Sequence, residues 1–274
     1  MRGPSPPPLL LDTELFSISQ INNLPDEQRR QVYRRLVPRQ VLQRLGIDPE
    51  TLADDEGRSL FELKCFPCAS SVELSLRHAW GAADPTMYLQ MADTPNNQIE
   101  VLLFIINDPY SERFDTDRLP DGTSTYFGTL KRNIEEEMRA MRAGLAPGQV
   151  RSGLGLTRRL VPTLERFVAD LNHDAVYIQP LAYHNAILFE RLGFFYMMGL
   201  GRMEWIQKEF APGGLLFKRL DEGAPFRRSG AETSIRGRSW AIHDGVLGEP
   251  YTGVKMYKRV GVHAGVVTFP NATW

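Results

Sequence analysis

The chain of 274 residues is short of three things: cysteine, charge of one sign and long apolar runs. Its two cysteines, Cys65 and Cys68, are too few for a disulfide framework and fit a reducing compartment. A formal net charge of -1 argues against nucleic acid or an anionic membrane surface as the main partner. The longest aliphatic or aromatic run, Val101 to Ile106, is far below the roughly 20 residues of a membrane span. We therefore expect a soluble, cytoplasmic protein.

Composition also bounds the domain organisation. The opening "MRGPSPPPLLLD" holds one Arg and a three-Leu cluster, too little for a secretory signal, so we expect residues 1–12 to be a disordered Pro-rich arm. With 42% hydrophobic residues, the rest can bury a sizeable core. We expect one domain over 13–220 and a loop-rich extension, 221–274, packing on the same domain.

The cysteines are spaced as "CFPC", which raises a thiol or metal role as one alternative. Zinc would need two more ligands, and the nearest histidine, His78, has no second His or Cys at finger-like spacing. A redox dithiol favours a helix after the first Cys, whereas "LFELKCFPCASSVELSL" indicates strand, turn, strand. We interpret the pair as ordinary small apolar residues near a turn and expect no metal.

Apolar periodicity predicts helices before and strands after residue 60. An apolar stripe over 24–47 predicts a helix that Pro38 divides in two. The following pattern predicts an antiparallel meander with strands near 61–65, 71–78, 86–92 and 98–106.

The second half of the chain mixes helices and strands. Polar residues with Pro and Gly, then a helix ending near Gly144, indicate an insertion or lid over about 109–147. An apolar face over 160–171 predicts a helix that Pro162 should kink or shift, and a buried strand follows, as in a βαβ unit. Further on we expect a helix stopped by Gly193, then strands at "FFYMMGL", "GVKMYKRV" and "AGVVTF".

The stretch "VRSGLGLTRR" places Gly153 and Gly155 directly before the helix that contains Pro162. A helix N-terminus presents unpaired N–H groups and binds phosphate where nothing bulky blocks the approach. With Arg151, Thr157 and the following arginines, the turn is a candidate pyrophosphate cradle. The alternative is a tight turn that needs glycine for positive φ. No Gly-Lys-Ser/Thr follows, which excludes a P-loop.

Together with the helix, the buried strand and the ending "FERLGFF", this turn resembles the GNAT acetyltransferase superfamily. The family's pyrophosphate loop reads Gln/Arg-x-x-Gly-x-Gly/Ala, and a later helix closes with a Tyr-Glu-x-Leu-Gly-Phe-like ending, which "ERLGF" at 190–194 matches. The resemblance covers about 150–200, and 70–107 in strand order. It implies an α/β (α+β) fold with a mixed, mostly antiparallel central sheet flanked by helices.

What the resemblance implies chemically is acyl transfer. Acyl-CoA lies in a splayed gap between two central strands, and an amine attacks its thioester, so positioning supplies most of the rate. The co-substrate would be acetyl-CoA or another acyl-CoA, and the acceptor an unknown small-molecule amine; a homodimer stays open. The residues implied in cofactor binding are Arg151, Gly153, Leu154, Gly155, Thr157 and Asn185.

The chain departs from the family pattern at two positions. Val150 stands where the loop has Gln or Arg, with Arg151 displaced by one. Phe189 stands where many members have the Tyr that protonates the departing thiolate, and a phenyl ring cannot donate a proton. Tyr183 or His184, which begin the same helix, could substitute, or could be ordinary helix-entry residues.

For a general base, Asp108 and Glu100 are the candidates, since both flank the strand "VLLFII"; Asp108 before Pro109 could equally be a turn former. Four arginines of the extension could hold a CoA phosphate or an acidic acceptor, or form a solvated loop: Arg227, Arg228, Arg236 and Arg238. The departures also leave a rival function, a non-catalytic acyl-CoA sensor that kept the fold and lost the chemistry.

Overall fold

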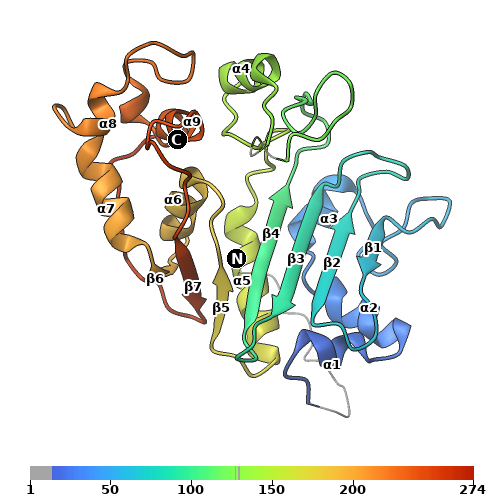
Figure 1. Ribbon diagram of the computed structural model, residues 1–274. Coiled ribbons are helices and arrows are strands. Elements are labelled where there is room, and N and C mark those ends of the chain that lie inside the picture. Colours follow the sequence, from blue (N-terminus) through green and yellow to red (C-terminus); the bar gives the residue numbers. More distant parts are fainter. Residues whose placement is uncertain (1–13, 127, 129) are drawn as a thin grey trace. The chain divides into compact units, whose positions relative to one another are not determined.

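The computed structural model describes residues 14–126, 128 and 130–274 and divides into two compact units (Figure 1). The chain passes between the units several times. The expected arm over 1–12 lies outside the described residues. Of the described residues, those within 14–109, 153–178 and 257–262 form the first unit, and those within 110–152, 179–256 and 263–274 form the second.

Helices come first in the described part of the chain, strands follow after residue 60, and the second half mixes the two. The helices are α1 Ile18–Asn22, α2 Asp26–Arg34, α3 Arg39–Leu45, α4 Ile134–Arg142, α5 Thr157–Asp170, α6 Tyr183–Arg191, α7 Leu200–Glu209, α8 Leu215–Lys218 and α9 Ile235–His243. The strands are β1 Phe61–Lys64, β2 Ser71–Leu76, β3 Met87–Asp93, β4 Ile99–Ile106, β5 Ala175–Ile178, β6 Phe195–Met198 and β7 Lys255–Arg259. Their order in the sheet is β1-β2-β3-β4-β5-β7-β6.

The first unit is built on the predicted meander. Strands β1 to β4 pair antiparallel with their sequence neighbours, and β4 pairs parallel with β5 after the crossover helix α5. A parallel pair needs such a crossover, so the βαβ expectation is confirmed. The mixed, mostly antiparallel sheet flanked by helices is confirmed as well.

One face of this sheet carries the core of the first unit. Alternate strand residues such as Leu74, Leu89 and Val101 are buried, as period-2 geometry requires. The helices on that face also pack on one another: the Tyr33 ring of α2 stacks on Phe167 of α5 with centroids 6.3 Å apart. The apolar stripes of α2 and α5 are therefore satisfied by the same core.

The second unit joins the insertion to the C-terminal part of the chain. Helix α6 contacts α9, and the buried indole of Trp240 in α9 donates to the carbonyl of Leu145 at 2.8 Å. The ring of Trp240 also stacks on Phe226 at 5.1 Å. The segment after α4 and the helix α9, far apart in sequence, thus share one core.

Two expectations for the C-terminal part were wrong. The stretch "SIRGRSWAIH", interpreted as loop, contains α9, which Ser234 caps by accepting from the N–H of Gly237 at 3.0 Å. Residues 264–269, expected as a strand, have no strand structure, whereas 255–259 form β7 as expected.

Pro162 lies inside a continuous α5 and does not shift the start of this helix.

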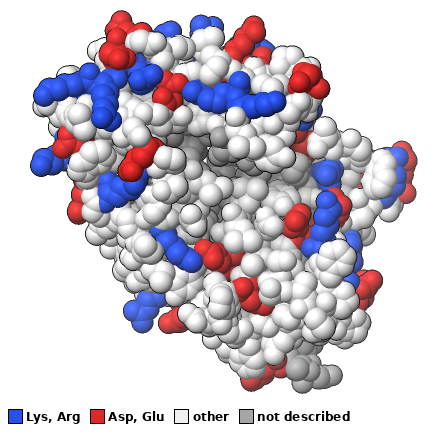
Figure 2. Space-filling model, in the orientation of Figure 1, with Lys and Arg blue, Asp and Glu red and all other residues white. Residues whose placement is uncertain are grey.

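Two further observations bear on partners. Among the described residues, no helix has the length and apolar character needed to cross a bilayer. Basic and acidic side chains both occur over the face shown in Figure 2, in keeping with a net charge near zero.

Candidate functional site

The two glycines before α5 differ in what they do. A Cβ on Gly153 would lie 3.4 Å from the carbonyl oxygen of Ile106, at the end of β4, so the loop passes close along that strand. Gly155 has φ +70, a left-handed conformation that side chains disfavour, and no atom within 4 Å of a Cβ there. Both glycines are exposed, whereas Leu154 between them is buried. Leu154 anchors the turn, and the glycines keep it open.

The helix that follows presents an uncapped N-terminus. Helix α5 has 14 residues, no side-chain cap and no acidic residue in its first turn. The N–H groups of Arg159 and Leu160 bond the Leu156 carbonyl, and those of Thr157 and Arg158 have no acceptor among the described residues. With exposed side chains on Arg158 and Arg159, this end of the helix can receive an anion.

Beside this turn, β4 continues beyond its pairing with the parallel strand β5. Within the described residues, the β4–β5 register covers Ile99 to Val101, although β4 continues to Ile106. A register shift against β3 at Gln90 and Met91 places a bulge at Leu102, which is 42% exposed. The later part of β4 therefore offers backbone groups on the side where β5 has ended.

The two candidate bases occupy different surroundings. Glu100 is half-buried near the start of β4, in register with Tyr177 of β5. Asp108, just after β4, pairs with Arg44 of α3 at 3.7 Å. The charge of Asp108 thus has a structural partner in the first unit.

The candidate acids on α6 lie in the core of the second unit. Tyr183 is 1% exposed, its ring meets Tyr251 edge-on at 6.5 Å, and burial raises its pKa to about 12. The Nδ1 atom of His184 lies 2.8 Å from the hydroxyl of Ser239, and burial lowers the pKa of His184 to about 3. Both side chains are neutral at pH 7.

Two other residues of α6 that the resemblance singled out, Phe189 and Asn185, lie further along the helix. Phe189 is buried against Phe194 with ring centroids 4.9 Å apart. Asn185 is half-buried one turn earlier. The structure thus brings together Tyr183, His184, Asn185 and Phe189 on one helix of the second unit. Gly153, Leu154, Gly155 and Thr157 form one turn of the first unit.

Glu190, noticed in the sequence only as part of "ERLGF", is a buried hub. Its carboxylate accepts from the Tyr196 hydroxyl at 2.6 Å and from the N–H and hydroxyl of Thr268 at 2.9 and 2.5 Å. Burial nevertheless raises the pKa of Glu190. The matching motif residue therefore holds the segment around Thr268.

A second buried network was not predicted. The Glu137 carboxylate, 2% exposed, accepts from Arg132 at 2.5 Å and from His243 at 3.2 Å. Asp244 accepts from Arg132 at 2.7 Å and from Arg227 at 2.8 Å. Burial alone would raise the pKa of Glu137, but the bonds from His243 and Arg132 outweigh it and lower the pKa. These five residues, the buried ion network, link α4, α9 and two loops.

The four arginines of the extension have different surroundings. Arg227 belongs to the buried ion network, and Arg236 donates to the carbonyl of Gly144. Arg238, 4% exposed, lies over the Phe210 and Phe269 rings at 5.0 and 3.5 Å, which contradicts the solvated-loop interpretation for that residue. Arg228 is exposed, in keeping with a solvated side chain.

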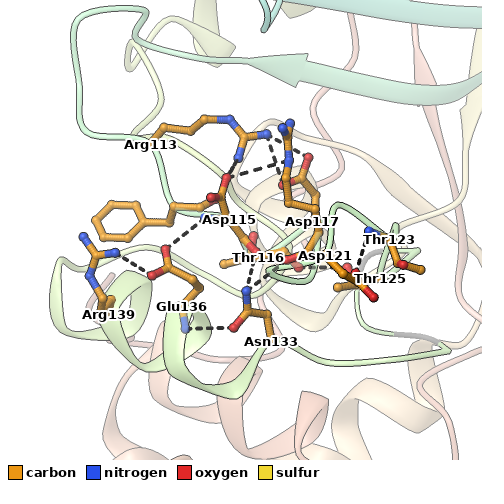
Figure 3. Close-up of polar contacts among 12 residues, drawn as sticks. Arg113, Asp115, Thr116, Asp117, Asp121, Thr123, Thr125, Asn133, Glu136 and Arg139 are labelled. Atoms are coloured by element: carbon orange, nitrogen blue, oxygen red, sulfur yellow. Dashed lines mark hydrogen bonds and ion pairs between the residues drawn. The ribbon is translucent and has the colours of Figure 1, made fainter.

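The acidic loop of the insertion is internally bonded (Figure 3). The Arg113 guanidinium bonds Asp115 and reaches Asp117 at 2.9 Å. The Asn133 amide donates to the carbonyls of Asp115 and Arg118 at 3.1 and 2.9 Å, while its oxygen caps α4. Arg151, expected at the cradle, donates to the carbonyl of Ser111 in this same unit. These contacts give the insertion a fixed local structure.

The cysteines follow the strand, turn, strand prediction. Cys68 is exposed with φ +61 in the turn, and its N–H and thiol both donate to the side-chain oxygen of Asn23, at 2.9 and 3.2 Å. Burial raises the pKa of the Cys65 thiol, which makes it a poorer nucleophile. Over the part of the chain that the structure describes, no group of three or more His, Cys, Asp or Glu could hold a metal.

With this geometry established, we compared the chain with known proteins. No protein-family model, no curated protein and no solved structure matches it.

Proposed function

We propose that the protein is an acyl-CoA-dependent acyltransferase of the GNAT type, which transfers an acyl group, most simply acetyl, to an amine. The observation that carries the proposal is the exposed turn of Gly153 and Gly155 between the end of β4 and the uncapped N-terminus of α5. A pyrophosphate is the ligand that such a turn suits best.

The proposed geometry assigns each part of the ligand to an element of the first unit. The pyrophosphate lies at the first turn of α5, where the N–H groups of Thr157 and Arg158 receive it. The thioester lies along β4 beyond Val101, where the pairing with β5 has ended. Backbone N–H groups aimed at the thioester oxygen would stabilise the negative charge that develops there.

The chemistry follows from that placement. The amine nitrogen attacks the thioester carbonyl carbon, the carbon–sulfur bond breaks, and CoA leaves as a thiolate. The amine proton passes to a base, for which Glu100 and Asp108 are the two candidates. Water protonates the thiolate; Tyr183 and His184 stay alternatives for this role that their burial does not favour.

A non-catalytic acyl-CoA sensor is the second candidate, and a specific observation favours it. Phe189 packs in an aromatic contact with Phe194, and His184 is buried with a pKa of about 3. Neither side chain can donate a proton at neutral pH, since one has no acidic proton and the other is neutral and bonded to Ser239. A fold that binds the thioester without an acid would suit sensing.

Calorimetry with acetyl-CoA tests the shared part of both functions. We expect binding to the wild type and a loss of at least tenfold in Gly155→Glu, which adds bulk and negative charge where phosphate should lie. Gly57→Glu is the matched control, because Gly57 also lies in the first unit with φ +78 and nothing within 4 Å of a Cβ. Equal acetyl-CoA affinity in the wild type and Gly155→Glu would contradict pyrophosphate binding at the turn of Gly153 and Gly155.

Thiol release separates the two candidates. Free CoA thiol produced from acetyl-CoA with a panel of amines supports the transferase. Tight acetyl-CoA binding with no thiol release from any amine supports the sensor instead.

A further inference from the structure

The turn between β1 and β2 holds both cysteines beside the end of α1. The N–H and the thiol of Cys68 donate to the side-chain oxygen of Asn23, and the Asn22 amide donates to the carbonyl of Ala69 at 2.7 Å. The N–H of Ala69 in turn bonds the Phe66 carbonyl at 3.1 Å. The two thiols are therefore carried three residues apart on one anchored turn, and the Cys68 side chain is exposed.

Cys65, at the other end of the turn, lies near the start of α2. The charges of Arg29 and Asp26 both act on its thiol. Arg29 is fixed there, because its guanidinium pairs with Asp26 and donates to the Asn22 carbonyl at 3.1 Å. The Nε–H of Arg29 is buried, and it has no acceptor in the part of the chain that the structure describes. A buried donor without an acceptor is unfavourable, so this place lacks one acceptor.

A thiolate at Cys65 would supply an acceptor for Arg29 and a charge opposite to that of the guanidinium. Thiolates are the ligands that soft cations such as Cu(I) prefer, whereas hard cations prefer oxygen. Zinc would need four ligands, and within the described ranges no group of three or more His, Cys, Asp or Glu could hold a metal. Two thiolates without further ligands suit a monovalent soft cation. The complex of two thiolates with one such cation keeps a single negative charge, which Arg29 can balance.

We propose that Cys65 and Cys68 bind a monovalent copper ion through their two thiolates, with Arg29 as hydrogen-bond donor and counter-charge to the Cys65 sulfur. Both thiols lose their protons to solvent as the two copper–sulfur bonds form, and copper stays Cu(I), so the step needs no oxidant or reductant. Cys68 gives up its thiol bond to Asn23 and keeps the N–H bond that anchors the turn. The site replaces our expectation of two ordinary small residues, and it does not depend on the proposed acyltransferase function.

Copper competition with the reduced full chain tests the site. Bicinchoninate forms a coloured complex with Cu(I), and without oxygen the wild type should bleach it by withdrawing one Cu(I) per chain. Cys65→Ser and Cys68→Ser should each weaken the Cu(I) affinity by at least about a hundredfold, because each variant keeps a single thiolate. Unchanged far-ultraviolet circular dichroism of both variants shows that the loss comes from the ligand and not from unfolding.

Arg29→Gln tests the positioning role of the guanidinium. We expect it to weaken the Cu(I) affinity by about tenfold to a hundredfold, as loss of a partner to a metal ligand does. X-ray absorption at the copper edge should still show two sulfur ligands. Arg34→Gln is the matched control, since Arg34 also lies on α2 and pairs with Glu50. Phe66→Ala, exposed between the two cysteines, is a second control, and both controls should leave the affinity unchanged.

Several results would overturn the site. One is a wild type that withdraws no Cu(I) from bicinchoninate, and another is equal withdrawal by the variant that lacks both thiols. Copper absorption that shows three or more protein ligands, or zinc bound as tightly as Cu(I), would contradict a two-thiolate copper site. Equal losses in Arg29→Gln and Arg34→Gln would remove Arg29 from it.

Discussion

The two units use polar side chains in opposite ways. In the first unit the groups suited to a ligand stand in the open: Gly153, Gly155 and Arg158 are exposed at the start of α5. In the second unit the reactive residue types are buried and already bonded, as with His184 on Ser239 and Glu190 on Thr268. The turn before α5 is therefore open to solvent, whereas these side chains of the second unit are engaged in internal hydrogen bonds.

The difference follows from the cost of burial. A polar group removed from water must find a hydrogen-bond partner, and a charge must find an opposite charge. Buried polar groups therefore already have partners in the folded protein. An exposed helix terminus can leave its N–H groups to water until an anion replaces it. A chemically reactive residue type is hence weak evidence for a site, and accessibility decides between the two uses.

The largest effect on stability is expected in the buried ion network of the second unit. Glu137→Ala leaves Asp244 as the only carboxylate for Arg132 and Arg227 and removes the partner of His243, so we expect the free energy of unfolding to fall by about 3–5 kcal/mol. Glu135→Ala, on the exposed side of the same helix, should change it by less than about 0.5 kcal/mol. Urea unfolding followed by tryptophan fluorescence measures both. Similar values for the two variants would show that the network carries no stability.

Close backbone packing in the second unit should produce the next largest effect. A Cβ at Gly237 in α9 would lie 2.4 Å from the Ala231 carbonyl oxygen, so Gly237→Ala should destabilise by about 1–3 kcal/mol. Gly201 in α7 has nothing within 4 Å of a Cβ, and Gly201→Ala should stabilise by up to about 1 kcal/mol. Melting temperatures that move in opposite directions would support this; a rise in both would contradict it.

Gly237 also shows why α9 could not be predicted. Its sequence, "IRGRSWAIH", has a central glycine, two arginines and little apolar periodicity, all typical of a loop. Arg238 is buried, and its guanidinium lies over the rings of Phe210 and Phe269, which are distant in sequence. No local pattern contains that contact.

The meander of the first unit was predictable for the opposite reason. Buried residues such as Leu74, Leu89 and Met91 alternate with more exposed neighbours, so the sequence of each strand predicts which of its faces is buried. The turn at Gly153 and the helix after it were equally local signals. The burial of Tyr183 and His184 was not, because α6 is covered on several sides and shows no clear polar face.

Acid titration should reveal the buried histidine of α6. His184 has a folded-state pKa of about 3 against an ordinary 6.5, so its contribution to stability is present above pH 6.5 and is lost as pH falls toward 3. Between pH 7 and 5 this amounts to about 2 kcal/mol. His184→Gln should remove that part of the pH dependence of the unfolding free energy. An unaltered pH dependence in His184→Gln would mean that protons reach the buried ring readily, and the second unit would then be more open than its packing implies.

The smallest effect on stability is expected at the turn before α5, and there it carries the most information. Arg158 and Arg159 are exposed, so replacing both with Ala should change the free energy of unfolding by less than about 1 kcal/mol. If the turn binds pyrophosphate, the same double variant loses two cations at the phosphate end of the helix, and its affinity for acetyl-CoA should fall about threefold to thirtyfold, with the loss shrinking at high salt. Calorimetry at two ionic strengths measures both quantities. If the double variant changes neither stability nor acetyl-CoA affinity, the two arginines are ordinary solvated side chains. The contrast between the solvent-exposed turn of the first unit and the internally bonded side chains of the second would then depend on the glycines alone.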